Sequence, residues 1–148
     1  MKSAIVYLGH SNTYTMRLFS ILFLIIVFTG SSFAQRFAHI TDQLPGGEYE
    51  NIHVKKLDDD PLTTTYLIWV KETVREHHHS EHTEVVYVFE GEGLMTLGEQ
   101  EQKIGPGDYV FVPKGTLHSV QVLSEEPMKV MSIQTPQFDG SDRIFSDQ

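Results

Sequence analysis

Short segments rich in β-branched and aromatic residues, separated by glycine or proline, fill the second half of the chain. Segments of this kind, with turn residues about every ten positions, are typical of an all-β sandwich or barrel. No stretch sustains the helical period of about 3.6 residues, and no internal repeat is visible. The strands that we expect cover residues 52–57, 63–70, 84–90, 94–97, 102–104, 109–112, 118–123 and 128–133.

The expected strands divide the chain after its first 34 residues into three parts. Residues 35–62 are polar, and their turn sequences LPGG and LDDDP predict an extension that holds one short strand. Residues 63–134 form the expected β domain, and residues 135–148 form a peripheral tail. The three consecutive aspartates lack the spaced alternation of a calcium loop, so we interpret them as a turn. If the tail packs, we expect the packing residues to be Phe138, Ile144 or Phe145.

The first 34 residues have the features of a secretory signal peptide. They contain no acidic residue, Arg17 precedes an apolar run at 18–28, and the small residues Ser32 and Ala34 follow with the spacing of an A-x-A cleavage signal. A charged start, a short apolar core and a small-residue end predict export and cleavage after residue 34. A membrane-spanning helix would need roughly 20 apolar residues, so we expect no stable membrane insertion after processing. We expect Met16 to be the true start, and the mature protein to be secreted or periplasmic.

The charge of the expected mature chain excludes several classes of function. Cleavage would leave 114 of the 148 residues and remove Lys2 and Arg17, so that nine of the 11 basic residues face all 20 acidic ones. Such a surface repels phosphate backbones, and nucleic acid is not an expected partner. The chain has no cysteine, which excludes disulfides and thiolate metal sites and leaves nitrogen and oxygen ligands for any metal.

Half of the eight histidines lie within residues 77–82, just before an expected strand. Residues two apart on an extended chain share a face, so His77 and His79 point together while His78 points away. Two imidazoles on one face can reach one cation, and a carboxylate is a natural third ligand. Glu84 follows after a four-residue turn. We expect antiparallel neighbouring strands to bring Glu84 back beside the two histidines.

A fourth candidate ligand follows a well-defined bend in GDYVFVPKGTLH. Gly107 opens the segment, and Pro113 and Gly115 end its strand in a tight turn, because proline fixes φ and glycine tolerates positive φ. His118 begins the return strand. A histidine at such a strand end lies near the mouth of a barrel, where binding sites occur.

The strand alternation also predicts the wall beside these residues. From Glu84 inward, Val86 and Val88 form an apolar wall, while Tyr87 and Phe89 face the opposite side. We assign no catalytic residue, since no general base stands out beyond the candidate ligands and a metal-bound water. Four further side chains could line a pocket but are more typical of a core: Tyr66, Ile68, Met95 and Phe111.

Taken together, the two segments resemble those of the cupin superfamily, and the resemblance covers roughly residues 66–133. The first cupin motif corresponds to His77-x-His79, four residues, Glu84, six residues and Gly91, and the second to Gly107, five residues, Pro113-x-Gly115, two residues and His118. The glycine that usually opens the first motif is Lys71 here, and the asparagine that usually closes the second is Val122. Both departures lie outside the ligand set and affect the expected loop geometry.

The resemblance implies a double-stranded β-helix, which is a small jelly-roll barrel. It also implies one divalent metal inside the barrel, with open positions for water or substrate. Three imidazoles and a carboxylate suit iron, manganese, nickel, copper, cobalt or zinc without choosing among them. By analogy with the family, a homodimer through sheet edges is expected. The ligands that the resemblance implies are His77, His79, Glu84 and His118.

Two less specific interpretations stay open at this point. The histidine run could be a solvated loop that titrates near neutrality, although this leaves the spacing of Glu84 and His118 unexplained. The barrel could also exist without a metal. His82 could replace His79 if the turn were tighter, but the spacing from Glu84 favours His79; we expect His78 and His82 at the rim of the site or beside the ligands.

Three functions are compatible with these residues. The first is an exported metal-dependent enzyme that acts on a small molecule by oxygenation, isomerisation or decarboxylation, between which the fold does not decide. The second is a non-catalytic module that binds a small molecule or the metal itself, without turnover. The third is a structural or storage role, in which the metal adds folding free energy.

Overall fold

The computed structural model describes residues 37–146, and from His39 onward the chain forms one compact unit. The predicted signal peptide at 1–34, with its start at Met16, lies outside the described residues, so export stays a prediction. Within the described range, no helix has the length and hydropathy needed to cross a bilayer.

The described residues form ten strands and no helix. Expected and observed strands agree to within two residues at most ends, but the strand over Thr73–His78 and the short one at the C-terminus add to the expected set. In chain order the strands are β1 (Ile52–Asp60), β2 (Thr63–Val70), β3 (Thr73–His78), β4 (Thr83–Glu90), β5 (Gly93–Leu97), β6 (Gln100–Ile104), β7 (Tyr109–Val112), β8 (His118–Val122), β9 (Met128–Thr135) and β10 (Ile144–Phe145).

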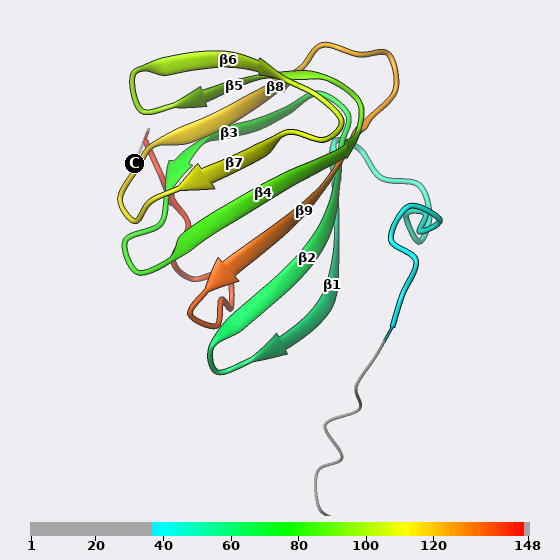
Figure 1. The fold of residues 1–148 in the computed structure, drawn as a ribbon. Helices are drawn as coiled ribbons and strands as arrows, with labels where there is room; N and C mark the ends of the chain where they lie inside the picture. Colours follow the sequence, from blue (N-terminus) through cyan, green and yellow to red (C-terminus); the bar gives the residue numbers. More distant parts are fainter. Residues whose placement is uncertain (1–36, 147–148) are drawn as a thin grey trace, which may run out of the picture. The chain divides into compact units, whose positions relative to one another are not determined.

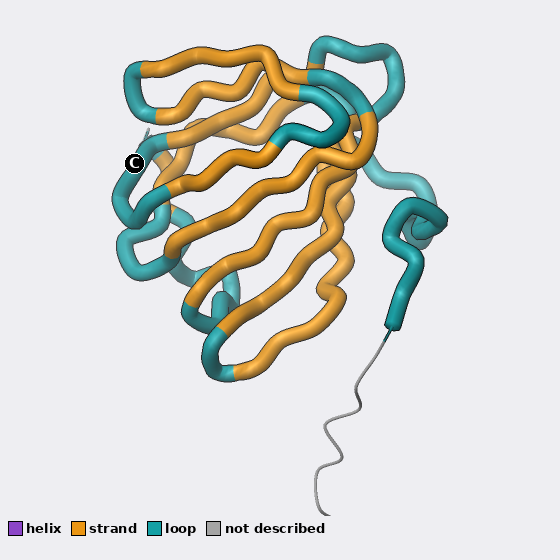
Figure 2. The backbone as a smooth tube through the Cα atoms, in the orientation of Figure 1, coloured by secondary structure: helices purple, strands orange, loops and turns teal. Residues whose placement is uncertain are grey.

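The strands form two antiparallel sheets, with the orders β1-β2-β9-β4-β7 and β10-β3-β8-β5-β6. From β2 to β10 the chain changes sheet at every connection except the one between β5 and β6. Figures 1 and 2 show the two sheets wound into one barrel. The predicted all-β class and the double-stranded β-helix are confirmed.

The core lies between the inner faces of the two sheets. On β4 the side chains alternate as expected, since Val88 is buried, Val86 packs against the core and Tyr87 is exposed. This alternation decides which residues of β4 can reach a site inside the barrel. The buried core cluster consists of Val88, Met95, Ile104, Val110, Val112, Met128 and Val130.

The N-terminal extension packs on the outer face of the first sheet. Lys129 on β9 is 1% exposed, and its ammonium donates hydrogen bonds to the Thr41 carbonyl at 2.7 Å and to the Glu90 carboxylate at 3.0 Å. Its Nζ also lies 5.9 Å from the ring centroid of Trp69. A buried ammonium needs such partners, and Lys129 therefore ties the extension to the sheet.

The predicted turn at the three aspartates is wrong in part. Strand β1 continues to Asp60, because Asp58 to Asp60 pair with Thr65 to Thr63 after an irregularity near Leu57. The turn comes later, where the Asp60 carboxylate accepts hydrogen bonds from the backbone N–H groups of Leu62 and Thr63. The run of acidic residues is thus an edge strand with a capped turn, as charged edge strands commonly are.

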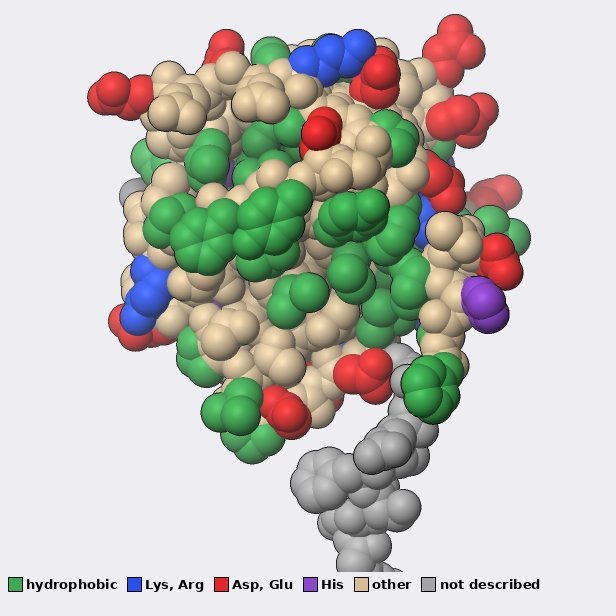
Figure 3. Space-filling view, in the orientation of Figure 1, with side chains coloured by type: hydrophobic (Ala, Val, Ile, Leu, Met, Phe, Trp, Pro, Cys, Tyr) green, Lys and Arg blue, Asp and Glu red, His purple; other side chains and the backbone are tan. Residues whose placement is uncertain are grey.

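Aromatic side chains gather on the outer face over β4 and β7. Tyr109 and Phe111 are 61% and 49% exposed, and Tyr87 lies beside them on β4. Figure 3 shows this apolar area on the surface. Phe111, which could have lined the inner cavity, faces outward with it. The homodimer expected by analogy stays a prediction.

Gly91 connects the two sheets at a point where the backbone leaves no room for a side chain. Its φ is +77°, and a Cβ would lie 2.7 Å from Cα of Met128. Gly107 has a φ of +95° but open space around the missing Cβ.

We predict that Gly107→Ala lowers the free energy of unfolding by about 1–2 kcal/mol, because alanine is strained at a positive φ. Gly91→Ala should lower the free energy of unfolding by about 1–3 kcal/mol more than Gly107→Ala, because its Cβ also overpacks against the backbone. Urea unfolding of both variants measures this difference; equal losses would contradict it.

Candidate metal centre

The four predicted ligands come together inside the barrel. Each offers one ligand atom, and these atoms all lie within 4.8 Å of one another. We call this set the His/Glu cluster. It consists of His77, His79, Glu84 and His118.

The two sheets share the cluster. His77 and His118 are directly paired across β3 and β8, and His79 lies just beyond the end of β3. Glu84 enters from β4, which belongs to the other sheet. The expected pairing of neighbouring strands is therefore wrong, because β3 and β4 do not pair and Glu84 reaches the histidines across the barrel interior.

The cluster is buried and tightly spaced. Its four residues are between 2% and 6% exposed. The ring centroid of His77 lies 4.1 Å from that of His118 and 5.0 Å from that of His79. Buried polar side chains normally have hydrogen-bond partners, so the partner of each nitrogen in the cluster shows what the site is built for.

Backbone carbonyls hold the outer nitrogen of every ring. A carbonyl oxygen can only accept, so each Nδ1 carries the hydrogen and donates it. In the neutral ring this leaves Nε2 as a lone-pair donor, which is the orientation that carbonyl partners give to metal-bound histidines. The contacts are His77 Nδ1 to the Arg75 carbonyl at 2.8 Å, His79 Nδ1 to the Asp142 carbonyl at 2.8 Å, and His118 Nδ1 to the Thr116 carbonyl at 2.9 Å.

The inner nitrogens face the carboxylate without a hydrogen bond. Nε2 of His79 and Nε2 of His118 lie 3.4 Å and 3.3 Å from Oε2 of Glu84, and both nitrogens are buried without a hydrogen-bond partner. Lone pairs and a negative charge that converge in this way repel one another unless a cation lies between them. Ligands about 2.0–2.2 Å from one ion are themselves roughly 3–3.5 Å apart, so the donor set fits a divalent metal.

The electrostatics of the cluster favour ligand-ready protonation states. Burial raises the pKa of Glu84, but His118 and His79 in their protonated forms, together with the hydroxyl of Ser132, outweigh burial and hold this pKa well below its usual range. Burial, followed by the charge of His118, lowers the pKa of His77 to about 4. Near neutral pH, Glu84 is therefore ionised and His77 is neutral, as metal ligands must be. Ser132 donates its hydroxyl hydrogen to Oε1 of Glu84 and leaves Oε2 for a metal.

A C-terminal arm, residues 136–146, completes the site, and Asp142 is its anchor. The carbonyl of Asp142 accepts a hydrogen bond from the His79 ring, and the carboxylate of Asp142 caps the turn that connects His79 to Glu84 on the next strand. These hydrogen bonds hold the pKa of Asp142 well below its usual range, against the effect of burial. The carboxylate accepts from Ser80 N at 3.0 Å, Ser80 Oγ at 2.6 Å, Glu81 N at 2.8 Å and His82 Nδ1 at 2.6 Å.

Two aromatic rings of the arm pack on the histidines. Phe138 is 4% exposed and lies edge-on to His79 and His82, with centroid distances of 5.1 Å and 5.0 Å. Phe145 lies 6.0 Å from the ring centroid of His77. Two of the three apolar tail residues therefore pack, while Ile144 stays exposed. The tail is a wall of the site.

His82 and His78 are not in the cluster. Both ring nitrogens of His82 are occupied, Nδ1 by the Asp142 carboxylate and Nε2 by the Gln137 carbonyl at 2.9 Å. It therefore anchors the arm and is not free to replace His79. Burial lowers the pKa of His82, but the hydrogen bonds that its ring donates to the Asp142 carboxylate and the Gln137 carbonyl outweigh burial and raise it. His78 alternates away from its neighbours on β3 and does not join the four converging ligand atoms.

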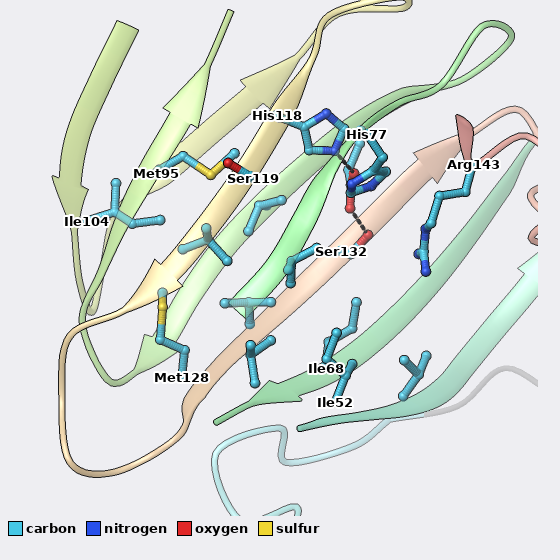
Figure 4. A pocket seen from close by; sticks show the side chains of 17 residues that line it. Ile52, Ile68, His77, Met95, Ile104, His118, Ser119, Met128, Ser132 and Arg143 are labelled. Carbon is cyan, nitrogen blue, oxygen red and sulfur yellow. Dashed lines mark hydrogen bonds and ion pairs between the residues drawn. The ribbon is translucent and has the colours of Figure 1, made fainter. Parts of the chain in front are cut away.

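A cavity adjoins the cluster. Its volume is about 80 Å³, on the scale at which one water needs roughly 10–15 Å³, so it suits a small molecule. Figure 4 shows His77 and His118 at one end, with aliphatic side chains along the rest of the wall. The lining residues are Ile52, Val54, Ile68, Val70, Val74, His77, Glu84, Val86, Met95, Ile104, His118, Ser119, Val120, Met128, Val130, Ser132 and Arg143.

Sequence reasoning missed Ser132, Asp142 and Arg143. Ser132 and Asp142 act through contacts with residues far along the chain, since Ser132 is 48 positions from Glu84 and Asp142 is 60 positions from His82. Arg143 lines a cavity whose other residues come from distant strands. Spacing within one motif carries no information about such contacts. The one available signal was the set of apolar tail residues Phe138, Ile144 and Phe145, which were expected to make the contacts if the tail packs.

A family model described as a cupin domain matches residues 65–134. An uncharacterised protein of Aquifex aeolicus is 33% identical over 98 residues, which are 66% of this chain and 80% of that protein. The chain belongs to the cupin family. The matched residues contain the whole His/Glu cluster, whereas the C-terminal arm lies beyond them.

Two further similarities are informative. Quercetin 2,3-dioxygenase of Bacillus subtilis is 36% identical over 61 residues, which cover 41% of this chain but 18% of that enzyme. Among solved structures, KdgF from Halomonas sp. has a TM-score of 0.61 at 20% identity and covers 70% of this chain and 97% of that one. At this identity the second likeness shows the fold alone.

The hydrogen-bond pattern predicts the tautomer of each cluster histidine. In metal-free protein at neutral pH, we expect His77, His79 and His118 to carry hydrogen on Nδ1, because backbone carbonyls accept there. Imidazole nitrogen chemical shifts, measured by long-range proton–nitrogen NMR, report the tautomer. His53, whose Nε2 accepts a hydrogen bond from Gly46 N, serves as reference. Hydrogen on Nε2 in the cluster would contradict the predicted ligand orientation.

Proposed function

We propose that this cupin holds one divalent transition metal in the His/Glu cluster and acts as a metal-dependent enzyme on a small organic molecule. The observation that carries the proposal is the pair of buried Nε2 atoms, of His79 and His118, that face the Glu84 carboxylate without a hydrogen bond. Iron, manganese, nickel, copper, cobalt and zinc all accept this donor set.

The cavity supports a catalytic role for the metal. His77, Glu84 and His118 line it, so a metal held by them borders the space that a substrate would occupy. A bound metal would supply Lewis acidity to a substrate oxygen or to water. The chain itself orients the three imidazoles through Nδ1, holds Glu84 ionised through Ser132, and surrounds the substrate with aliphatic side chains that exclude water.

The similarity to quercetin 2,3-dioxygenase makes oxygenation the first reaction type to test. That likeness spans 18% of the enzyme, so its substrate does not transfer to this chain. Isomerisation and decarboxylation stay within the proposal, because the fold supports all three.

A non-catalytic binding module is the second candidate. It is favoured by the lack of a free acid or base among the described residues that line the cavity. The Ser132 hydroxyl donates a hydrogen bond to Glu84, and the titratable side chains apart from Arg143 belong to the cluster.

Oxygen uptake and product analysis with phenols and organic acids, on protein loaded with each metal in turn, distinguish the enzyme from the binding module. Turnover that Glu84→Gln abolishes supports the enzyme; binding without turnover for every metal supports the module.

Export remains part of the proposal. It depends on the signal-like residues 1–34, and amino-terminal sequencing of the protein in its natural host tests it. A mature end at Gln35 supports export, and a chain that retains the apolar run at 18–28 in the cytoplasm contradicts it.

Adjacent histidines give a sharp test of metal binding. In untagged protein we predict that His79→Ala and Glu84→Gln lower metal affinity by at least about 100-fold, because changes outside the ligand set alone cost roughly 10–100-fold. His78→Ala, which changes the neighbouring residue on the opposite face, keeps wild-type affinity. Elemental analysis and competition with a chelator measure these affinities. Equal metal content in all four proteins would contradict the proposed site.

A further inference from the structure

The C-terminal arm places a guanidinium at the cavity beside the His/Glu cluster. Arg143 lines the same cavity as His77, Glu84 and His118, and Figure 4 shows its side chain extending toward that space. Among residues 37–146, no other lysine or arginine lines this cavity. The arm therefore contributes the one permanent positive charge of the described pocket.

Nothing in the described part of the chain neutralises this charge. Arg143 has no ion pair there, and its contact is with the ring of Phe138, whose centroid lies 6.0 Å from Cζ. Cavity residues Ile52, Val54 and Arg143 are all exposed, so the cavity opens to the surface beside them. A ligand that enters there meets the free N–H donors of the guanidinium.

The backbone on both sides of Arg143 is anchored. Asp142 bonds the turn after β3 through its carboxylate and His79 through its carbonyl. On the other side, Ile144 and Phe145 pair with β3. An arginine between two fixed points loses less conformational freedom when it binds a ligand, which increases affinity.

The charges around the cavity favour an anion. Glu84 is the one carboxylate that lines it, and in the proposed metalloprotein the two positive charges of the ion and the charge of Arg143 exceed its single negative charge. This step rests on the proposed function. Even without the ion, Arg143 faces the cavity unpaired, whereas Glu84 is turned toward the imidazoles and Ser132.

The surroundings distinguish a carboxylate from a phosphate. A guanidinium binds one carboxylate through two parallel hydrogen bonds, whereas phosphate sites usually add helix N-termini or further cations. The described residues contain no helix, and aliphatic side chains make up most of the cavity wall. We propose that the cavity takes a small organic carboxylate, whose acid group pairs with Arg143 and whose apolar part contacts these walls.

Carboxylates and their matching alcohols test this proposal by calorimetric titration of the full chain. The probes are butanoate, hexanoate and benzoate, compared with 1-butanol, 1-hexanol and benzyl alcohol. We expect at least one acid to bind about 10-fold or more tightly than its alcohol, since hydrogen bonds to charged groups are the stronger class. Arg143→Met should remove this preference. Arg143→Lys should retain a part of it, because lysine keeps the positive charge but lacks the two parallel N–H donors of the guanidinium.

Lys103→Met is the matched control for the loss of one positive charge. Lys103 is exposed on β6, pairs with Glu92 at 2.7 Å and does not line the cavity, so this variant should keep the full preference for the acid. Thermal melting of each variant confirms folding. The proposal is overturned if no acid binds with a Kd below about 10 mM, if acids and alcohols bind alike, or if Arg143→Met keeps the preference.

Two readouts separate this proposal from the proposed function. Metal content tests the His/Glu cluster, and the acid-over-alcohol preference is measured both in metal-loaded and in chelator-treated protein. If wild type binds no metal while its preference for acids depends on Arg143, the metalloenzyme proposal fails and the carboxylate site stands. If metal binds and the preference ignores Arg143, the carboxylate site fails alone.

Discussion

Three hydrogen bonds from ring nitrogens to backbone carbonyls determine what this barrel can hold. They assign the hydrogen of each cluster imidazole to Nδ1, and Nε2 of His79 and Nε2 of His118 face Glu84. A hydroxyl, that of Ser132, holds the other carboxylate oxygen. The protein thereby buries converging electron pairs with no hydrogen between them, an arrangement that costs free energy unless a cation occupies their common point.

The barrel architecture makes this arrangement rigid. Because β3 and β8 supply histidines from one sheet and β4 supplies the carboxylate from the other, a shared ion would bind the two sheets together. Metal binding would then add to the free energy of unfolding. The arm contributes a second closure, since Asp142 ties the turn between β3 and β4 to the C-terminal end of the described chain.

Much of this could be predicted from local patterns. Alternation along 84–90 placed Val86 and Val88 inside, and the spacing of the two motifs selected the four residues that converge. Motif spacing works here because the bends that carry the ligands are short and strongly determined, as at Gly115 with its φ of +74°.

Contacts between distant segments could not be predicted. The sequence suggested that Glu84 would pair beside the histidines, because adjacent strands usually do so, yet here they belong to different sheets. The arm was expected at the periphery, since a polar tail gives no sign of its partner; Asp142 and Arg143 gain their roles only when β10 pairs with β3. The aspartates at 58–60 formed a strand because pairing with β2 outweighed their preference for turns.

X-ray absorption spectroscopy of the metal-loaded, untagged protein tests most directly whether the four side chains share one ion. We predict a first shell that contains three imidazole nitrogens and a carboxylate oxygen, with one imidazole lost in His118→Ala. A spectrum without imidazole scattering, or one that His118→Ala leaves unchanged, would contradict the proposed metal centre.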